Sequence, residues 1–160
     1  MTFTSRIDLS DHVRKQACGL LQARLSDALD LEAQAKQAHW NVKGPHFLQL
    51  HQLFDGVHDA AEDFVDTMAE RITTLGHIAD GRVTTTAAAT TLYLYPLEAA
   101  GGEAHLKALS ASIAAFGKAV RAAIDQADTI GDADTADLFT QVSRETDKQL
   151  WLLEAHLQAH

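Results

Sequence analysis

Cysteine and proline are scarce in this chain of 160 residues. The single cysteine, Cys18, excludes a disulfide within the chain and is typical of a reducing compartment, so we expect a cytoplasmic protein. Only two prolines and a 46% share of hydrophobic residues favour helices and disfavour a β-sandwich or a disordered chain. The length is that of one domain, which we place over residues 1–160.

Long apolar runs and basic segments are also missing. No stretch approaches the roughly 18 apolar residues of a membrane-spanning helix, and the N-terminus lacks the apolar segment of a signal peptide, so we expect no membrane partner. The 22 Asp and Glu residues outnumber the 13 Lys and Arg residues, which leaves a formal net charge of −9. This excess disfavours binding to nucleic acid or anionic lipid through the overall field of the protein.

Glycine and proline divide the chain into four long stretches in which apolar residues recur with a helical period of 3.6. The predicted helices cover residues 8–39, 46–75, 103–130 and 132–157. Asp8 is the expected N-cap of the first helix, and Gly76 is expected to end the second in the left-handed conformation.

The connection between the second and third predicted helices, residues 77–102, is unusually long for a compact bundle. The other two connections are short and predict two helical hairpins. A long connection lets the hairpins pack with one crossover, which we expect to carry a short helix. The predicted fold is therefore an all-α, ferritin-like four-helix bundle.

One face of the second predicted helix carries imidazoles and carboxylates without any basic residue. At 100° per residue these side chains fall within an arc of roughly 120°. No Lys or Arg occurs from His46 through Glu70, so no ion pair within the helix offsets the repulsion between the carboxylates. Bound cations would offset it, whereas an ordinary solvated face is the alternative interpretation. The residues of this face are His51, Asp55, His58, Asp59, Glu62, Asp66 and Glu70.

The spacing on this face predicts a site shared between two chains. His51 and Asp55 are one turn apart, as are Asp66 and Glu70, but the two pairs are separated by about 16 Å along the helix axis. One chain cannot bring both pairs to one metal ion. The numbers of His51 and Glu70 have the same sum as those of Asp55 and Asp66, so two antiparallel copies of the helix would bring the pairs together about a twofold axis.

His39 completes the predicted site, because it lies at the same level as His51 across the turn between the first two helices. The expected ligands are His39, His51 and Asp55 of one chain with Asp66 and Glu70 of the other. Two neutral imidazoles and three carboxylates carry a charge of −3, which suits two divalent cations. The mixed nitrogen and oxygen donors suit Fe(II), Mn(II) or Zn(II).

The segment His39–Asp55, HWNVKGPHFLQLHQLFD, resembles the signature of the Dps family, the mini-ferritins that protect DNA in starved bacteria. Asp66–Arg71, DTMAER, resembles the second signature of that family, and the likeness extends over essentially the whole chain, including Tyr95-Pro96 and Trp151. The resemblance implies a ferritin-like bundle that assembles from twofold dimers into a hollow shell of twelve subunits.

The resemblance also implies an enzyme, a ferroxidase that acts under oxidative stress. Family members oxidise Fe(II), mostly with hydrogen peroxide, at centres that hold two irons between two subunits, and they store the Fe(III) as mineral. Zinc or manganese can substitute for iron. Trp40 matches the tryptophan beside the centre, where a packing role and a redox role are both open. The ligands of the family fall on His39, His51, Asp55, Asp66 and Glu70.

Direct coating of DNA is the alternative function, that of a nucleoid-associated DNA-binding protein. Members of the family that bind DNA usually rely on a lysine-rich tail. Here the first ten residues contain only Arg6 and Asp8 as charged groups, and residues 157–160 contain no basic run. We therefore expect protection through iron chemistry rather than through direct binding. A third interpretation is a structural helical oligomer whose charged face is only solvated.

Three carboxylates lie at the start of the last predicted helix, at Asp132, Asp134 and Asp137. The helix is expected to begin at Asp132 or Asp134, and capping by Asp134 with Asp137 in the first turn accounts for two of them. The resemblance places this segment near a threefold axis, where each Asp becomes a ring of three. Because such a ring concentrates cations, we predict that Asp132, Asp134 or Asp137 lines a pore through which iron enters.

Overall fold

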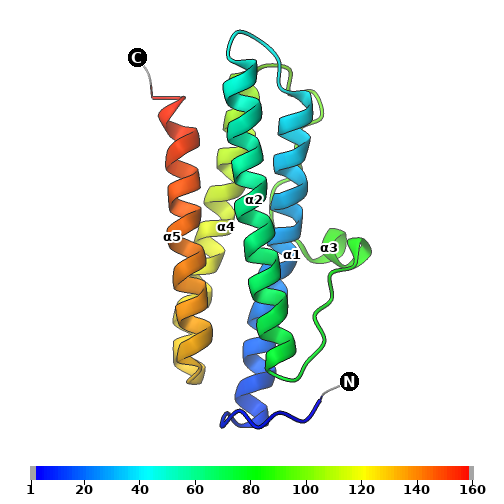
Figure 1. Cartoon of the computed structure of the whole chain (residues 1–160), viewed down its shortest axis with the longest axis vertical. Coiled ribbons are helices and arrows are strands. Elements are labelled where there is room, and N and C mark those ends of the chain that lie inside the picture. Colours follow the sequence, from blue (N-terminus) through cyan, green and yellow to red (C-terminus); the bar gives the residue numbers. More distant parts are fainter. Residues whose placement is uncertain (1–2, 159–160) are drawn as a thin grey trace.

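The computed structural model describes residues 3–158, and every regular element within that range is a helix. Met1, Thr2, Ala159 and His160, which belong to the termini discussed above for their lack of basic charge, lie outside the described residues. Four long helices form a bundle, and a short helix lies beside it (Figure 1). The helices are α1 (Asp11–Asn41), α2 (Phe47–Thr74), α3 (Val83–Ala89), α4 (Gly102–Ile130) and α5 (Ala133–Ala155).

The helices are wired as two antiparallel hairpins, α1–α2 and α4–α5. Helix α1 also packs against α4 and α3, and α2 packs against α5. The segment from α2 to α4 runs the length of the bundle and carries α3, so α2 and α4 point in the same direction (Figure 1). The predicted all-α four-helix bundle with a long crossover and a short helix is confirmed.

The core lies where the apolar faces of the four long helices meet. Each of three helices contributes a fully buried phenylalanine, Phe54, Phe116 and Phe139, and the rings of Phe64 and Phe116 stack with centroids 5.9 Å apart. Burying a side chain of this size contributes about 1.5–3 kcal/mol. This core fixes the rotation of α1 and α2 about their axes and therefore the face that each presents outward.

Buried polar side chains hold the crossover against the bundle. The Gln34 side-chain amide donates to the carbonyl oxygen of Tyr93 at 2.9 Å, and its oxygen accepts from the Ser112 hydroxyl at 2.6 Å. The buried carboxylate of Asp27 accepts from the backbone N–H of Thr91 at 2.7 Å. These bonds satisfy polar groups that would otherwise be buried without partners.

The N-terminal segment lies at the open end of the α1–α2 hairpin, opposite its turn. The prediction of Asp8 as N-cap is wrong, because Ser10 caps α1 and its hydroxyl accepts from Val13 N at 3.3 Å. The preceding segment is irregular, with a bend at Asp8 and Leu9, and Ile7 and Leu9 pack on the core. The left-handed Gly76 is confirmed with φ +86°, and a Cβ there would lie 2.6 Å from Phe3 O, so only glycine permits this close approach.

Candidate metal centre

His39 and His51 face each other across the turn between α1 and α2. Their rings stack with centroids 3.6 Å apart and planes inclined by 22°. His39 Nδ1 donates to the backbone oxygen of His51, and His51 Nδ1 donates to that of His39, both at 2.9 Å. In a neutral ring this leaves Nε2 unprotonated and able to bind a metal, which is the usual arrangement of metal-binding histidines. The predicted common level of these two residues is confirmed.

Asp55 lies beside this histidine pair. Its Oδ1 is 3.6 Å from His39 Nδ1, and it also forms an ion pair with Lys36 of α1. The hydrogen bond from Lys36 is the main cause that holds the pKa of Asp55 below its usual value. The second helix itself supplies no counter-charge to this face, as the sequence indicates, but Lys36 of the neighbouring helix α1 does.

Asp66 and Glu70 are exposed, and they lie farther along the same uninterrupted helix. At 1.5 Å per residue, the distance from Asp55 to Asp66 along the axis is about 16 Å, so the chain does not bring these carboxylates to the histidine pair. The structure therefore places three of the five predicted ligands, His39, His51 and Asp55, together and leaves two apart.

Trp40 follows His39 on α1, and 68% of its surface is exposed. It lines a cavity of about 470 Å³ together with Lys36, His58 and Val83. Most of this aromatic side chain is therefore not packed within the chain.

Of the three carboxylates at the start of α5, Asp132 has a structural role. It is the N-cap of the helix and accepts from Thr135 N at 3.1 Å, so the expectation that Asp134 is the cap is wrong. Asp132 is buried and pairs with Arg71 of α2 at 2.8 Å. Asp134 and Asp137 are exposed, and only these two present their carboxylates to solvent.

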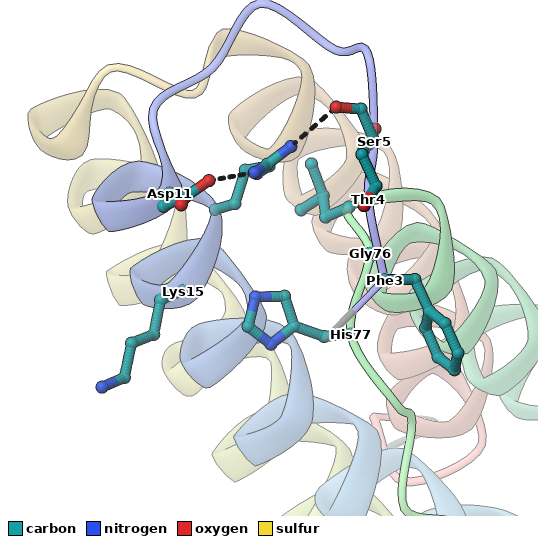
Figure 2. Close-up of a pocket in the computed structure, with 9 residues that line it drawn as sticks. Phe3, Thr4, Ser5, Asp11, Lys15, Gly76 and His77 are labelled. Atoms are coloured by element: carbon teal, nitrogen blue, oxygen red, sulfur yellow. Dashed lines mark hydrogen bonds and ion pairs between the residues drawn. The ribbon is translucent and has the colours of Figure 1, made fainter. Parts of the chain in front are cut away.

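A second cavity, of about 350 Å³, lies where the N-terminal segment meets the end of α2 (Figure 2). Arg14 and Lys15 give it a basic lining, but the Arg14 guanidinium pairs with Asp11 and donates to Ser5 O at 3.5 Å. The backbone bond from Phe3 N to Gly76 O closes one side. The cavity thus results from fixing the N-terminal segment, and it lies at the end of the hairpin opposite His39 and His51.

His105 of α4 is a buried polar residue that no motif or spacing in the sequence singles out. His105 is buried, and its Nδ1 is 2.7 Å from the hydroxyl of Tyr95 in the crossover. Burial lowers the pKa of His105 and raises that of Tyr95 to about 12, so both groups stay neutral near pH 7.

Within the described residues, no helix combines the length and apolar character needed to cross a bilayer.

Comparison with known proteins identifies the family. The ferritin-like domain matches residues 18–159. The DNA protection during starvation protein of Agrobacterium fabrum is 39% identical over 157 residues, which cover 98% of this chain and 97% of the relative.

Two solved structures show the same fold. Dps from Microbacterium arborescens in the high iron form is 36% identical and superposes with a TM-score of 0.86, covering 92% of this chain and 96% of that one. DpsC from Streptomyces coelicolor is 28% identical, with a TM-score of 0.94 over 100% of this chain and 94% of that one. Iron storage and DNA protection are the general roles of this family, and ferroxidase activity is general among its members. The chain belongs to the Dps family of ferritin-like proteins.

Proposed function

We propose that this protein oxidises Fe(II), with hydrogen peroxide as the preferred oxidant, at centres that hold two irons between two subunits. The Fe(III) is stored as mineral in a hollow shell of twelve subunits, and in the bacterial cytoplasm this removes the reactants that damage DNA. The observation that carries the proposal is the stacked pair His39 and His51, with Asp55 beside it and both Nδ1 atoms bound to backbone oxygens.

The position of the other two ligands supports a site between subunits. Asp66 and Glu70 are exposed on α2, about 16 Å and about 22 Å beyond Asp55 along the axis, so a neighbouring chain can reach them. A twofold axis at the level between residues 60 and 61 of α2 brings Asp66 and Glu70 of the partner subunit to His51 and Asp55. The twofold relation then generates two equivalent centres per dimer.

The ligand set suits the proposed reaction. Carboxylate oxygens are hard donors that stabilise Fe(III) relative to Fe(II), and the −3 charge of three carboxylates offsets the charge of two irons. Two Fe(II), one hydrogen peroxide and two protons give two Fe(III) and two water molecules. Because the two irons supply one electron each, peroxide is reduced in a single encounter and hydroxyl radical is not released.

Direct binding to DNA is not part of the proposal. The net charge of −9 per chain makes a shell of twelve chains strongly anionic, and the first ten residues contain only Arg6 as a basic side chain. Phosphate backbones are repelled by such a surface. A gel-shift experiment at low salt is expected to leave DNA unretarded, and retardation would favour the DNA-coating alternative.

The central experiment removes single ligands. Asp66→Ala and Glu70→Ala are expected to abolish rapid peroxide-dependent oxidation of Fe(II) while the oligomer still assembles, because both residues are exposed and contribute nothing to the core. Asp63→Ala, another exposed carboxylate of α2, is the matched control and should keep the parent rate. Parent rates in both ligand variants would contradict the site and favour the alternative of an ordinary solvated face.

Mixed shells test whether the site is shared. A dimer of one His51→Ala chain and one Glu70→Ala chain has one centre with both defects and one intact centre. Random mixing in equal amounts is therefore expected to restore about one quarter of the centres, although each variant alone has none. If mass spectrometry confirms mixing and the mixed shells are still inactive, the site lies within one chain.

A further inference from the structure

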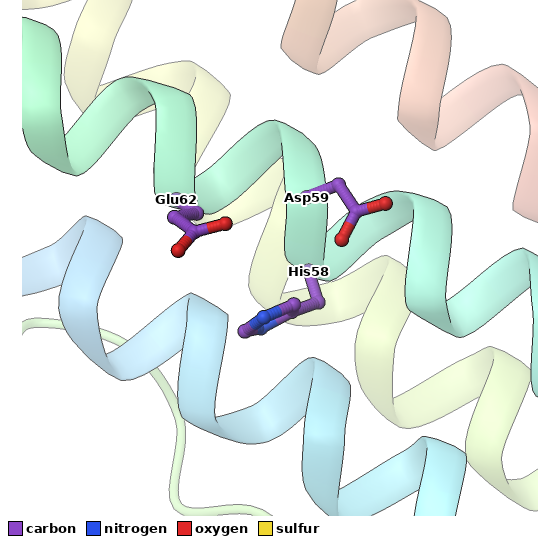
Figure 3. Close-up of side chains that lie close together, drawn as sticks. All are labelled: His58, Asp59 and Glu62. Atoms are coloured by element: carbon purple, nitrogen blue, oxygen red, sulfur yellow. The ribbon is translucent and has the colours of Figure 1, made fainter.

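A second group of side chains of the kinds that bind metals lies about one helical turn beyond Asp55. Figure 3 shows His58, Asp59 and Glu62 projecting from α2, with the imidazole between α2 and α1. One ligand atom from each of the three lies within 4.8 Å of those of the other two. Bonds of about 2.0–2.2 Å to a common ion require ligand atoms slightly closer than this, so small side-chain rotations would complete the site.

The histidine distinguishes this group from an ordinary acidic patch. The ring is held in the groove between the helices, with 16% of the side chain exposed. Its Nδ1 lies 3.5 Å from the backbone oxygen of Glu32 and 3.9 Å from the Glu32 carboxylate, both longer than a strong hydrogen bond. The imidazole is thus fixed in place without a strong partner, and Glu32 of α1 brings a fourth donor to it.

The charge around this imidazole is not neutralised within the chain. In the described part of the chain, no lysine or arginine forms an ion pair with Glu32, Asp59 or Glu62. The nearby Lys36 is engaged with Asp55. Within the described residues, the three carboxylates at this imidazole thus have no basic ion-pair partner, which favours a bound cation.

We infer that Glu32, His58, Asp59 and Glu62 form a binding site for one divalent transition-metal ion, separate from the centre at His39 and His51. One imidazole nitrogen and carboxylate oxygens suit Fe²⁺, Mn²⁺, Co²⁺ or Zn²⁺, whereas Ca²⁺ and Mg²⁺ prefer oxygen donors alone. The cavity of about 470 Å³ that Glu32 and His58 line gives an ion access from solvent.

The same ion would stabilise the proposed dimer, an extension that rests on the proposed function. In the antiparallel pairing of α2, Asp59 faces the partner's Glu62, and the two carboxylates repel each other. A cation bound on each side of the twofold axis replaces this repulsion by attraction to both chains. Divalent cations are then expected to strengthen the dimer contact.

The test counts Co²⁺ bound by the full-length protein after the proposed iron centre is disabled. In a chain with His51→Ala and Glu70→Ala, equilibrium dialysis and the visible absorption of Co²⁺ are expected to show one ion per chain. Adding His58→Ala or Glu62→Gln is expected to weaken its binding about tenfold or more. The two additional variants remove different donors, and Glu62→Gln keeps the size of an exposed side chain, so loss of the fold does not obscure the result.

Two matched controls keep the comparison specific. His12→Ala removes an exposed histidine of α1, and Asp63→Asn removes an exposed carboxylate adjacent to Glu62. Both are expected to retain the parent Co²⁺ affinity. The inference is overturned if the disabled chain binds no Co²⁺, or if His58→Ala and Glu62→Gln bind it as tightly as the controls. Either result leaves the proposed iron centre standing, because that centre is tested by Fe(II) oxidation in single-ligand variants.

Discussion

The imidazole rings of His39 and His51 lie face to face at 3.6 Å, and each donates from Nδ1 to the backbone oxygen of the other residue at 2.9 Å. The acceptors are main-chain atoms, so each ring is oriented by the opposite helix rather than by the opposite side chain. Removing one imidazole therefore leaves the bond that orients the other.

His39→Ala is expected to leave His51 in the tautomer with hydrogen on Nδ1, because the backbone oxygen of residue 39 remains. Loss of one ligand nevertheless should slow peroxide-dependent Fe(II) oxidation about tenfold or more. The tautomer is read from ¹⁵N NMR of metal-free protein labelled at histidine, with the signals assigned by comparison with His51→Ala. A His51 ring with hydrogen on Nε2 in the variant would contradict the role of the backbone.

Lys36 competes with metal for Asp55, because its ammonium group forms an ion pair with the same carboxylate. Lys36→Gln keeps most of the side-chain stem and removes this competitor. Partly exposed ion pairs contribute about 0.2–1 kcal/mol, so Zn(II) binding at the centre is expected to tighten by up to about fivefold. Lys15→Gln, at the other end of α1, is the control, and calorimetric titration measures the change. Unchanged or weaker binding in Lys36→Gln would show that the lysine does not compete.

Much of this fold could be predicted because its determinants are local in the sequence. The 3.6-residue period and the glycines at helix ends are properties of short windows, and two short turns with one long connection select the wiring. The level of His39 opposite His51 follows from the turn alone, since a hairpin brings residues equally distant from its midpoint together.

The side-chain pairs that the sequence did not predict depend on how the helices are rotated against each other. Lys36 reaches Asp55, and Arg71 reaches Asp132, only because packing turns those faces together. Counting along a helix gives the level of a residue but not which neighbour it meets. The buried contact between His105 and Tyr95 joins a helix to an irregular segment, and no periodic pattern marks it.

Asp132 is expected to contribute more to stability than the two exposed carboxylates that follow it. It caps α5 and offsets the charge of Arg71, of which only 14% is exposed. Asp132→Ala removes both interactions, and loss of one member of a buried ion pair costs about 3–5 kcal/mol. Asp134→Ala, with a side chain that is 86% exposed, is the control and should change the free energy of unfolding by about 0.5 kcal/mol or less. Urea denaturation at fixed protein concentration compares them, and equal midpoints would contradict the structural role of Asp132.

Cys18 is expected to resist alkylation in the folded protein. Burial is the main cause that raises the pKa of its thiol to about 11, and the thiolate is the reactive form. At pH 8 roughly one thiol in a thousand is then ionised, against about one in four for an unperturbed thiol. Iodoacetamide should react about two orders of magnitude more slowly than with the protein in guanidinium chloride. The rate should rise about tenfold per pH unit up to pH 10, and a plateau below pH 9 would contradict the raised pKa.

Asp134 and Asp137 are the carboxylates of the α5 segment that remain available to attract iron, because Asp132 is buried against Arg71. If they line a pore at a threefold axis, as we propose, each forms a ring of three that concentrates Fe(II) by its potential. Asp134→Asn and Asp137→Asn are then expected to slow Fe(II) oxidation and to weaken its dependence on salt, since screening has less attraction to remove. The ligands of the iron centre stay intact, so the rate at saturating Fe(II) should approach that of the parent.

The control for this prediction is Glu98→Gln, which changes an exposed carboxylate of the crossover. Parent rates and parent salt dependence in both aspartate variants would mean that iron enters elsewhere and that the exposed carboxylates serve the dipole of α5 alone.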